Sequence, residues 1–270
     1  MTRRILLVGW IVTAVVTAAE EAPRAIQVTE PPKQAESTAA DEVISRSHQF
    51  RISGGDSMAR GMTALLAEDA KDELLRLTGE EDEWKVPVAM VLHGKPGDPL
   101  PPRTIAMQLI IVAGVKELRI DKHLGSGLEK KRFQRAVTGA LLYERALKAG
   151  AGGDGESPMM VPQWLLEGLR EATAWRINES DRRLYATLFK QGGLFKIDDL
   201  FAVDENSFET MDGASRSAFR VSSGALVMAL LEQPQGKEGF RAFLTEVAAY
   251  EGEMPVLLRK HFPELNLSET

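Results

Sequence analysis

A carboxylate, Glu144, stands at a position where the sequence predicts the apolar face of a helix. In the stretch "ALLYERAL", residues 140–147, and just before it, Phe133, Val137 and Ala140 recur at helical spacing. At about 100° per residue, Glu144 falls about 20° from Phe133, in the middle of this stripe. A buried ionised carboxylate is costly unless it is paired or hydrogen-bonded. Either an arginine or a wet helix rim satisfies Glu144, or it faces a cleft.

A second motif lies downstream, in "VPQWLLEGLREATAW", residues 161–175. Its Pro-x-Trp-Leu-x-Glu-Gly pattern resembles the segment that follows His-Glu-x-x-His in gluzincin-type, peptidase MA-like metallopeptidases of the zincin clan. In this chain "YERAL", residues 143–147, stands in the place of that first motif. The resemblance implies that Glu144 corresponds to the general base, Tyr143 and Leu147 to the two histidine ligands, and Glu167 to the third zinc ligand.

The chain departs from the family pattern at both histidines. A catalytic zinc needs about three protein ligands and one open position. Leucine has no donor atom, so Glu167 is the one ligand of the family set that remains, and without zinc Glu144 has no activated water to deprotonate. We therefore expect a zincin fold without zincin chemistry, with no cofactor and no metal ligands. A rebuilt site that recruits His93 or His123 is the alternative.

The remaining motif positions permit further expectations. Glu167 lies either at the former cleft or, because Leu165, Leu166, Leu169 and Ala172 form the apolar face of its helix, on the surface. We expect the Tyr143 hydroxyl to donate to Glu167 and to replace a metal bridge by a hydrogen bond worth about 1–2 kcal/mol. Trp164 is counted with the groove residues, although it and Trp175 are better explained as packing anchors.

The elements that must position these residues follow from hydrophobic periodicity. "HQFRIS" predicts a strand with His48, Phe50 and Ile52 on one face, and Asp56 and Gly79 delimit a helix over 57–78. Strands are predicted at 85–94, 103–114 and 116–121, and helices at 128–148, 162–177, 180–190, 215–232, 236–250 and 253–261. This order predicts an α+β domain with its helices segregated toward the C-terminal half. The zincin resemblance covers residues 45–265, with halves at about 45–150 and 158–265.

Composition excludes several classes of function. With 44% hydrophobic residues the chain can bury a core, and its net charge of −6 without a basic patch argues against nucleic-acid binding. The absence of cysteine removes disulfides, thiol catalysis and thiolate metal sites. The four histidines are never three or four residues apart, so no helix offers a histidine pair to a metal. The acidic clusters at 80–83 and 204–209 are expected to be solvated loops.

The N-terminus resembles an export signal. Arg3 and Arg4 precede an apolar run at 5–18, which is shorter than the roughly 20 residues of a membrane-spanning helix. Cleavage after Ala19 predicts a secreted or periplasmic protein with no stable membrane span. Residues 20–44, rich in Ala, Glu, Pro and Thr, are expected to be a disordered linker.

Together these features predict an exported, catalytically inactive metallopeptidase-like domain. In active relatives an extended peptide pairs with the edge strand of the sheet, so we expect this chain to bind an extracellular peptide or protein in the former substrate groove. Two alternatives remain: an active metallopeptidase with a rebuilt metal site, and a structural cell-envelope interaction protein.

Overall fold

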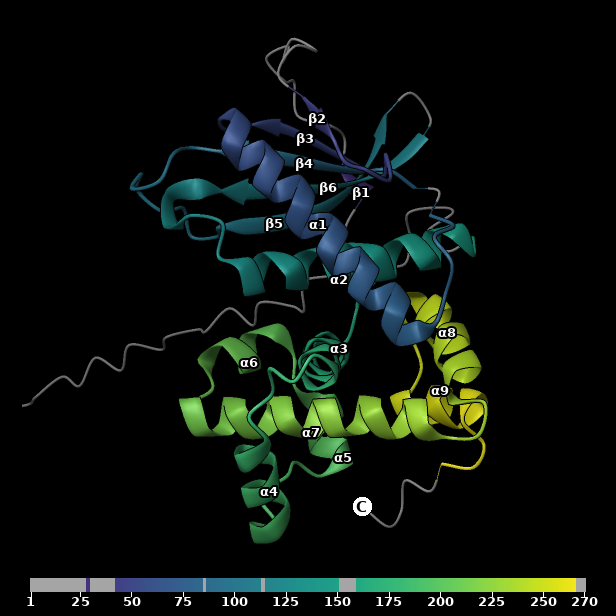
Figure 1. The fold of residues 1–270 in the computed structure, drawn as a ribbon. Helices are drawn as coiled ribbons and strands as arrows, with labels where there is room; N and C mark the ends of the chain where they lie inside the picture. The colour runs from purple at the N-terminus through teal and green to yellow at the C-terminus, as the bar shows by residue number, and fades with distance from the viewer. Residues whose placement is uncertain (1–27, 30–41, 85, 113–114, 151–158, 266–270) are drawn as a thin grey trace, which may run out of the picture.

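The computed structural model describes residues 28–29, 42–84, 86–112, 115–150 and 159–265. It has an α+β fold, in which a mixed sheet and two long helices are followed by a helical half (Figure 1). The predicted signal peptide and most of the predicted linker lie outside the described residues. Within that linker, however, Val28–Thr29 and Val43–Ile44 form strands β1 and β2, so the ordered chain begins before Ser45.

The sheet has the strand order β1-β5-β6-β4-β3-β2. Strands β3, β4 and β6 are parallel neighbours, whereas β5 pairs antiparallel with β6 and lies toward one edge. The short strand β1 adds to β5 in parallel, and β2 pairs antiparallel with β3 at the other edge. The longer strands are β3 (Phe50–Gly54), β4 (Val88–His93), β5 (Ile105–Val112) and β6 (Val115–His123).

One face of this sheet carries the core. Side chains alternate along a strand, and Phe50 and Ile52 on β3 and Leu118 and Ile120 on β6, which point to this face, are all 0% exposed. On the opposite face, Arg51 of β3 pairs with Glu117 of β6. The fully buried apolar side chains of the first face must be covered by other elements, and the long helices cover them.

The first covering helix, α1 (Ser57–Thr78), has the bounds that the sequence predicts. The Asp56 side chain accepts a hydrogen bond from the Ala59 N–H, which satisfies one of the free donors of the first turn. Gly79 ends the helix in the left-handed conformation (φ 70°), which glycine adopts without steric cost. The capping residues at both ends therefore explain why the bounds of α1 could be predicted from the sequence.

The second covering helix, α2 (Lys130–Lys148), lies between the sheet and the helical half (Figure 1). Phe133 and Val137 face the sheet and are 0% exposed, but Leu142, which points the opposite way on the helical wheel, is also 0% exposed. A helix that is buried on all sides is sandwiched between two layers. The motif residues on α2 therefore belong to the interior of the molecule.

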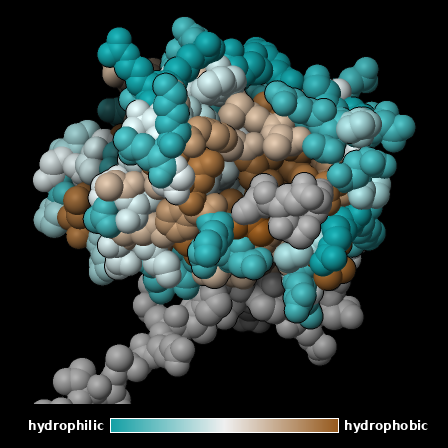
Figure 2. Space-filling model, turned by 90° about the horizontal axis from the view of Figure 1, so that it is seen from below, coloured by the Kyte–Doolittle hydropathy of each residue, from teal (hydrophilic) through white to brown (hydrophobic). Residues whose placement is uncertain are grey.

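From residue 159 to 265, the described chain consists of helices and their connections. Gly168 of α3 allows α3 and α7 to approach closely, because a Cβ atom there would lie 2.6 Å from Val227 Cγ2 and 2.7 Å from the Ser223 carbonyl oxygen. The elements are α3 (Gln163–Arg176), α4 (Arg182–Gln191), α5 (Ile197–Ala202), α6 (Glu205–Thr210), α7 (Gly213–Glu232), α8 (Gly236–Glu246) and α9 (Met254–His261). Seen from below, this half exposes an apolar area bordered by polar side chains (Figure 2). No helix within the described ranges is long and apolar enough to cross a membrane.

Two local predictions are wrong. His48 is not on the buried face of a strand: it lies in the turn between β2 and β3, is exposed, and has φ 62°. The acidic segment at 204–209 is not simply a solvated loop, because Asp204 accepts a hydrogen bond from the Ser207 N–H at 2.7 Å and caps α6. In both places a local turn or cap decides the backbone conformation, and periodicity over a few residues does not detect it.

Candidate functional site

Glu144 is buried rather than placed in an open cleft. The residue is 1% exposed, and its Oε1 atom accepts a hydrogen bond of 3.1 Å from the backbone N–H of Val86. Val86 belongs to the connector that leads from α1 to β4. The prediction that Glu144 faces a cleft is therefore wrong, because a backbone donor from a distant segment provides the hydrogen bond that a buried carboxylate requires.

The neighbouring residue, Arg145, holds the same connector. Its guanidinium donates to both carboxylate oxygens of Glu80, at 2.7 Å for one of them, and lies 5.0 Å from the ring centre of Trp84. From α1, the buried Lys71 ammonium is 2.8 Å from the Asp82 carboxylate. The acidic cluster at 80–83 is therefore anchored by basic side chains of α1 and α2, and the expectation of a purely solvated loop is wrong.

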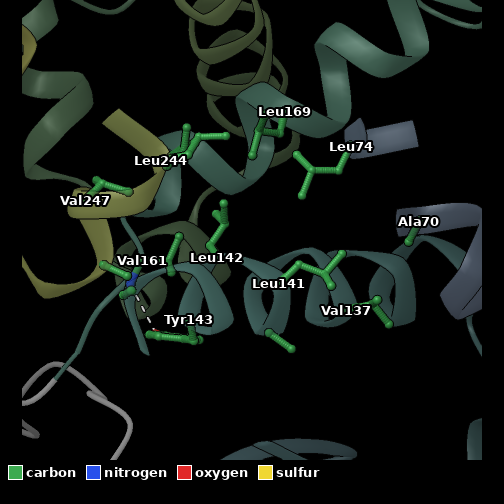
Figure 3. Close-up of a cluster of buried hydrophobic side chains, with 14 of the residues drawn as sticks. Ala70, Leu74, Val137, Leu141, Leu142, Tyr143, Val161, Leu169, Leu244 and Val247 are labelled. Carbon is green, nitrogen blue, oxygen red and sulfur yellow. Dashed lines mark hydrogen bonds between the residues drawn. The ribbon is translucent and has the colours of Figure 1, made fainter. Parts of the chain in front are cut away.

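Tyr143 does not bridge to Glu167. It is 7% exposed, and its hydroxyl accepts a hydrogen bond of 3.1 Å from the backbone N–H of Val161, just before α3 (Figure 3). Burial raises the pKa of Tyr143 to about 12, so the hydroxyl stays protonated at neutral pH. The predicted hydrogen bond to Glu167 is replaced by a bond between α2 and the segment that enters α3.

Glu167 is buried between two arginines. It is 3% exposed; Oε2 accepts from Arg170 Nη2 at 2.8 Å, and Oε1 lies 3.1 Å from Arg135 Nε on α2. Of the two positions that the sequence left open for Glu167, the surface is excluded by this burial, and the side chain is enclosed by arginines rather than open to a cleft. The two arginines also line a small pocket of about 70 Å³ between α1, α2 and α3. Two cations neutralise the carboxylate and offset the cost of its burial.

The motif positions are directed at different partners. Glu144 contacts the connector before β4, and Tyr143 contacts the segment before α3. Glu167 contacts Arg135, which lies on α2 two helical turns, or about 12 Å, before Tyr143. Leu147 is 8% exposed and belongs to the hydrophobic core. Although they share the family's spacing in sequence, these residues do not build one polar centre.

These residues do not fit a zinc ion. Leu147 has no donor atom, the Tyr143 hydroxyl is a neutral phenol, and the Glu167 carboxylate is already shared by two guanidinium groups. In the part of the chain that the structure describes, no group of three or more histidine, aspartate or glutamate side chains is placed to hold a metal.

His93 and His123 lie at the far end of the sheet from Glu144. They are register partners at the ends of β4 and β6, where His93 Nε2 is 2.6 Å from Asp121 Oδ1. His123 Nδ1 accepts from the Gly125 N–H at 3.2 Å. Glu144 contacts Val86, seven residues before His93 and so about 20 Å away along β4. Neither histidine is placed to complete the motif.

Trp164 lies in the core of the helical half. It is 1% exposed, and its ring centre is 5.4 Å from that of Phe201 and 6.1 Å from that of Phe243. Trp175, at the end of α3, lies 4.8 Å from the ring of Tyr185. Neither tryptophan presents a face to an open groove, so both residues act in packing.

The outer edge of β5 is a candidate recognition feature of the sheet. Its sequence, "IAMQLIIV", has no charge, glycine or proline over eight residues. The His123 N–H donates to the Thr104 carbonyl, so the backbone groups of Thr104 face β6. In an antiparallel strand the backbone N–H and C=O groups of successive residues face alternately toward and away from the partner strand. Those of Ile105, Met107 and Leu109 therefore face away from β6, toward the outer edge. Within the described residues, only the two residues of β1 pair with this edge. A long uncharged edge strand is a template for another strand.

Helix α2 supports this edge from the core side. The methyl end of Met107 approaches Gly139 so closely that a Cβ atom there would lie 3.3 Å from it, and Leu166 of α3 lies 3.8 Å from the same point. Leu109, two residues further along β5 and on the same face, is 1% exposed. The core-facing side chains of β5 therefore pack against α2, and this packing holds the edge strand in place for strand addition.

Comparison with known proteins assigns no family. No family model matches the chain, and neither a curated protein nor a solved structure is significantly similar to it. What the protein does must therefore follow from its own residues and geometry.

Proposed function

We propose that the chain is a non-catalytic, zincin-like domain that binds an extended peptide segment by strand addition at the outer edge of β5. The observation that carries this proposal is the uncharged eight-residue edge strand, whose outward backbone groups pair within the described residues only with β1. The order of strand, helix, small sheet and buried helix agrees with what the sequence resemblance implies for a zincin.

The edge defines the chemistry of the ligand. An extended main chain satisfies the outward N–H and C=O groups of Ile105 and Met107, which supplies affinity without regard to sequence. Side chains of the ligand alternate between the two faces of the sheet. Because β5 carries no charge, an uncharged segment rich in β-branched residues is the ligand class that this edge favours.

The contacts of Glu144 and Glu167 argue against peptide hydrolysis. In the family pattern the base activates a metal-bound water, but here Glu144 binds a backbone N–H and Glu167 is paired with Arg135 and Arg170. A metallopeptidase with a rebuilt site would need ligands that these positions do not offer. The apolar run at 5–18 supports export, so the proposed ligand is an extracellular or periplasmic peptide or protein segment.

The decisive experiment measures whether a bound peptide behaves as an added strand. A peptide-display library is screened against the purified full chain, and the tightest binder is N-methylated one residue at a time. Strand addition predicts that binding is lost at every second residue, because only alternate amides face β5. It also predicts that the peptide remains uncleaved after prolonged incubation.

A matched pair of variants locates the site. Ile105→Pro removes an outward N–H at the first residue of β5, where proline leaves the ladder to β6 intact, and should weaken binding at least tenfold. Ile105→Val keeps the N–H and should bind like the parent. A library without binders, a methylation pattern without period two, or an Ile105→Pro variant that folds and binds normally would each overturn the proposal.

A further inference from the structure

The chain itself places a strand on the edge that we propose as the peptide site. Val28 and Thr29 form β1, which pairs in parallel with Leu109 and Ile110 of β5. These two positions lie in the C-terminal half of the eight-residue edge. A ligand strand that follows the whole edge therefore competes with β1 for the same backbone groups.

The pairing is short, so a ligand can displace it. Two residues of β1 contact β5, whereas a ligand along Ile105–Val112 would form a ladder about four times as long. In contrast to a free ligand, β1 is tethered: residues 30–42 connect it to β2 on the other side of the sheet. A tethered competitor acts at a high effective concentration even when its own contacts are few.

We infer that Val28–Thr29 is a built-in competitor that lowers the affinity of the β5 edge for its peptide ligand, a regulation that rests on the proposed strand-addition function. A site that is open for only a fraction of the time binds its ligand more weakly by that fraction. The segment lies downstream of the predicted signal cleavage after Ala19, so it remains in the mature chain. A partner or protease that removes β1 from the edge would switch the domain to its high-affinity state.

The test compares three full-length chains: the parent, the double variant Val28→Pro with Thr29→Pro, and the control Val28→Ala with Thr29→Ala. Proline removes both N–H donors of β1, whereas alanine keeps them. The probe is the tightest peptide from the display screen, and its Kd is measured by fluorescence anisotropy. We expect the proline variant to bind about three- to tenfold more tightly than the parent, and the alanine variant to bind within about twofold of it.

Hydrogen exchange supplies an independent reading of the same pairing. The outward amide of Leu109 should be protected in the parent and the alanine variant but should exchange faster in the proline variant, without any peptide present. Equal peptide affinity in all three chains, or equal exchange at Leu109, would overturn the competitor and leave peptide binding intact. Failure of all three chains to bind any peptide would overturn the proposed function itself.

Discussion

Tyr143 and Tyr185 are both buried, but their hydroxyl groups differ in a way that can be measured. The Tyr143 hydroxyl accepts from the Val161 N–H, whereas among the described residues the Tyr185 hydroxyl has no hydrogen-bond partner. Tyr143→Phe leaves a buried N–H unsatisfied and should lower the free energy of unfolding by about 1–3 kcal/mol. Tyr185→Phe should change it by less than about 0.5 kcal/mol. Urea unfolding of both variants checks this, and equal losses would contradict it.

The ionisation of Tyr143 predicts an alkaline limit to stability. Burial raises its pKa from 10.0 to about 12 in the folded state. A group with a raised folded pKa stabilises fully below its unfolded pKa and loses that contribution as pH rises through the folded pKa. Stability should therefore fall between pH 10 and about pH 12, and Tyr143→Phe should make the fall shallower. An unchanged slope in the variant would show that other groups control alkaline unfolding.

At the residue scale, the sequence places Glu144 on the apolar stripe of its helix, but among the described residues the cleft expected there is absent, and the group that binds Glu144 could not be predicted. The apolar stripe of α2 is a local pattern, and Glu144 is 1% exposed as that pattern indicates. Its hydrogen-bond donor, Val86, is 58 positions away in the chain. One partner of Glu167, Arg135, was equally hidden because it belongs to another helix, whereas Arg170 lies three residues further along α3, at the spacing of a helical ion pair. No spacing rule within one helix identifies a partner that only tertiary packing brings close.

Among the elements, the connector from α1 to β4 is held on the α2 side mainly by Arg145. Arg145 pairs with Glu80 and contacts Trp84, whereas Lys148 contacts only the exposed side of the connector through the Glu83 carbonyl oxygen and carboxylate. Arg145→Met should cost about 1–3 kcal/mol, because it leaves the Glu80 carboxylate without its main partner. Lys148→Met should cost less than about 0.5 kcal/mol. Thermal unfolding of the two variants distinguishes the roles.

The pH dependence of this loss has a definite sign. Burial opposes ionisation of Glu80, but the hydrogen bonds and charge of Arg145 outweigh it and lower the pKa below 4.5. A depressed folded pKa gives stability that is present above the unfolded pKa and lost as pH falls through the folded value. The difference between the parent and Arg145→Met should therefore shrink below pH 4.5. A constant difference down to pH 3 would rule out the ion pair as its source.

The approach of α3 to α7 gives a test of packing. At Gly168 a Cβ atom would meet the Ser223 backbone at 2.7 Å, whereas at Gly139 it would meet the movable methyl end of Met107 at 3.3 Å. Gly168→Ala should therefore destabilise by about 1–3 kcal/mol despite its gain in helix propensity. Gly139→Ala should stay within about 1 kcal/mol of the parent. If both variants unfold at the same urea concentration, the close approach is not limiting.

Element prediction succeeded where signals were long and delimited. The 22-residue α1 has a cap at each end, so its bounds are read directly from Asp56 and Gly79. The six-residue helices α5 and α6 are too short for periodicity to reveal, and β2 has two residues. His48 shows the converse error: the alternating pattern was extended two residues before the start of β3, into a turn.

For the whole molecule, the resemblance to a zinc motif can be tested by completing the motif. Tyr143→His with Leu147→His rebuilds the His-Glu-x-x-His sequence. We expect no near-stoichiometric zinc after purification, because Glu144 remains bonded to Val86 and Glu167 to its two arginines. Elemental analysis of the purified parent and variant checks this. Tight zinc binding with peptide hydrolysis in the variant would mean that the two helices retain a working geometry.

At the molecular scale, the α+β class and the two long helices α1 and α2 could be predicted from the sequence. The position of α2 between the sheet and the helical half could not. The order of strands and helices in the sequence fits the observed architecture. That α2 is enclosed by both the sheet and the helical half follows only from the packing of Leu142, which lies on the face that a single amphipathic stripe leaves polar.

The uncharged edge of β5 has a consequence beyond recognition. Proteins protect exposed edges with charge, proline or a covering segment, because stacked copies of an unprotected strand form cross-β aggregates. Strand β5 has neither charge nor proline, and β1 covers two of its residues. When β1 is displaced, a bound peptide would take over this protection, so the ligand would keep the protein from polymerising. Empty, uncovered chains at high concentration should form fibrils that bind thioflavin T, and saturating peptide should suppress them.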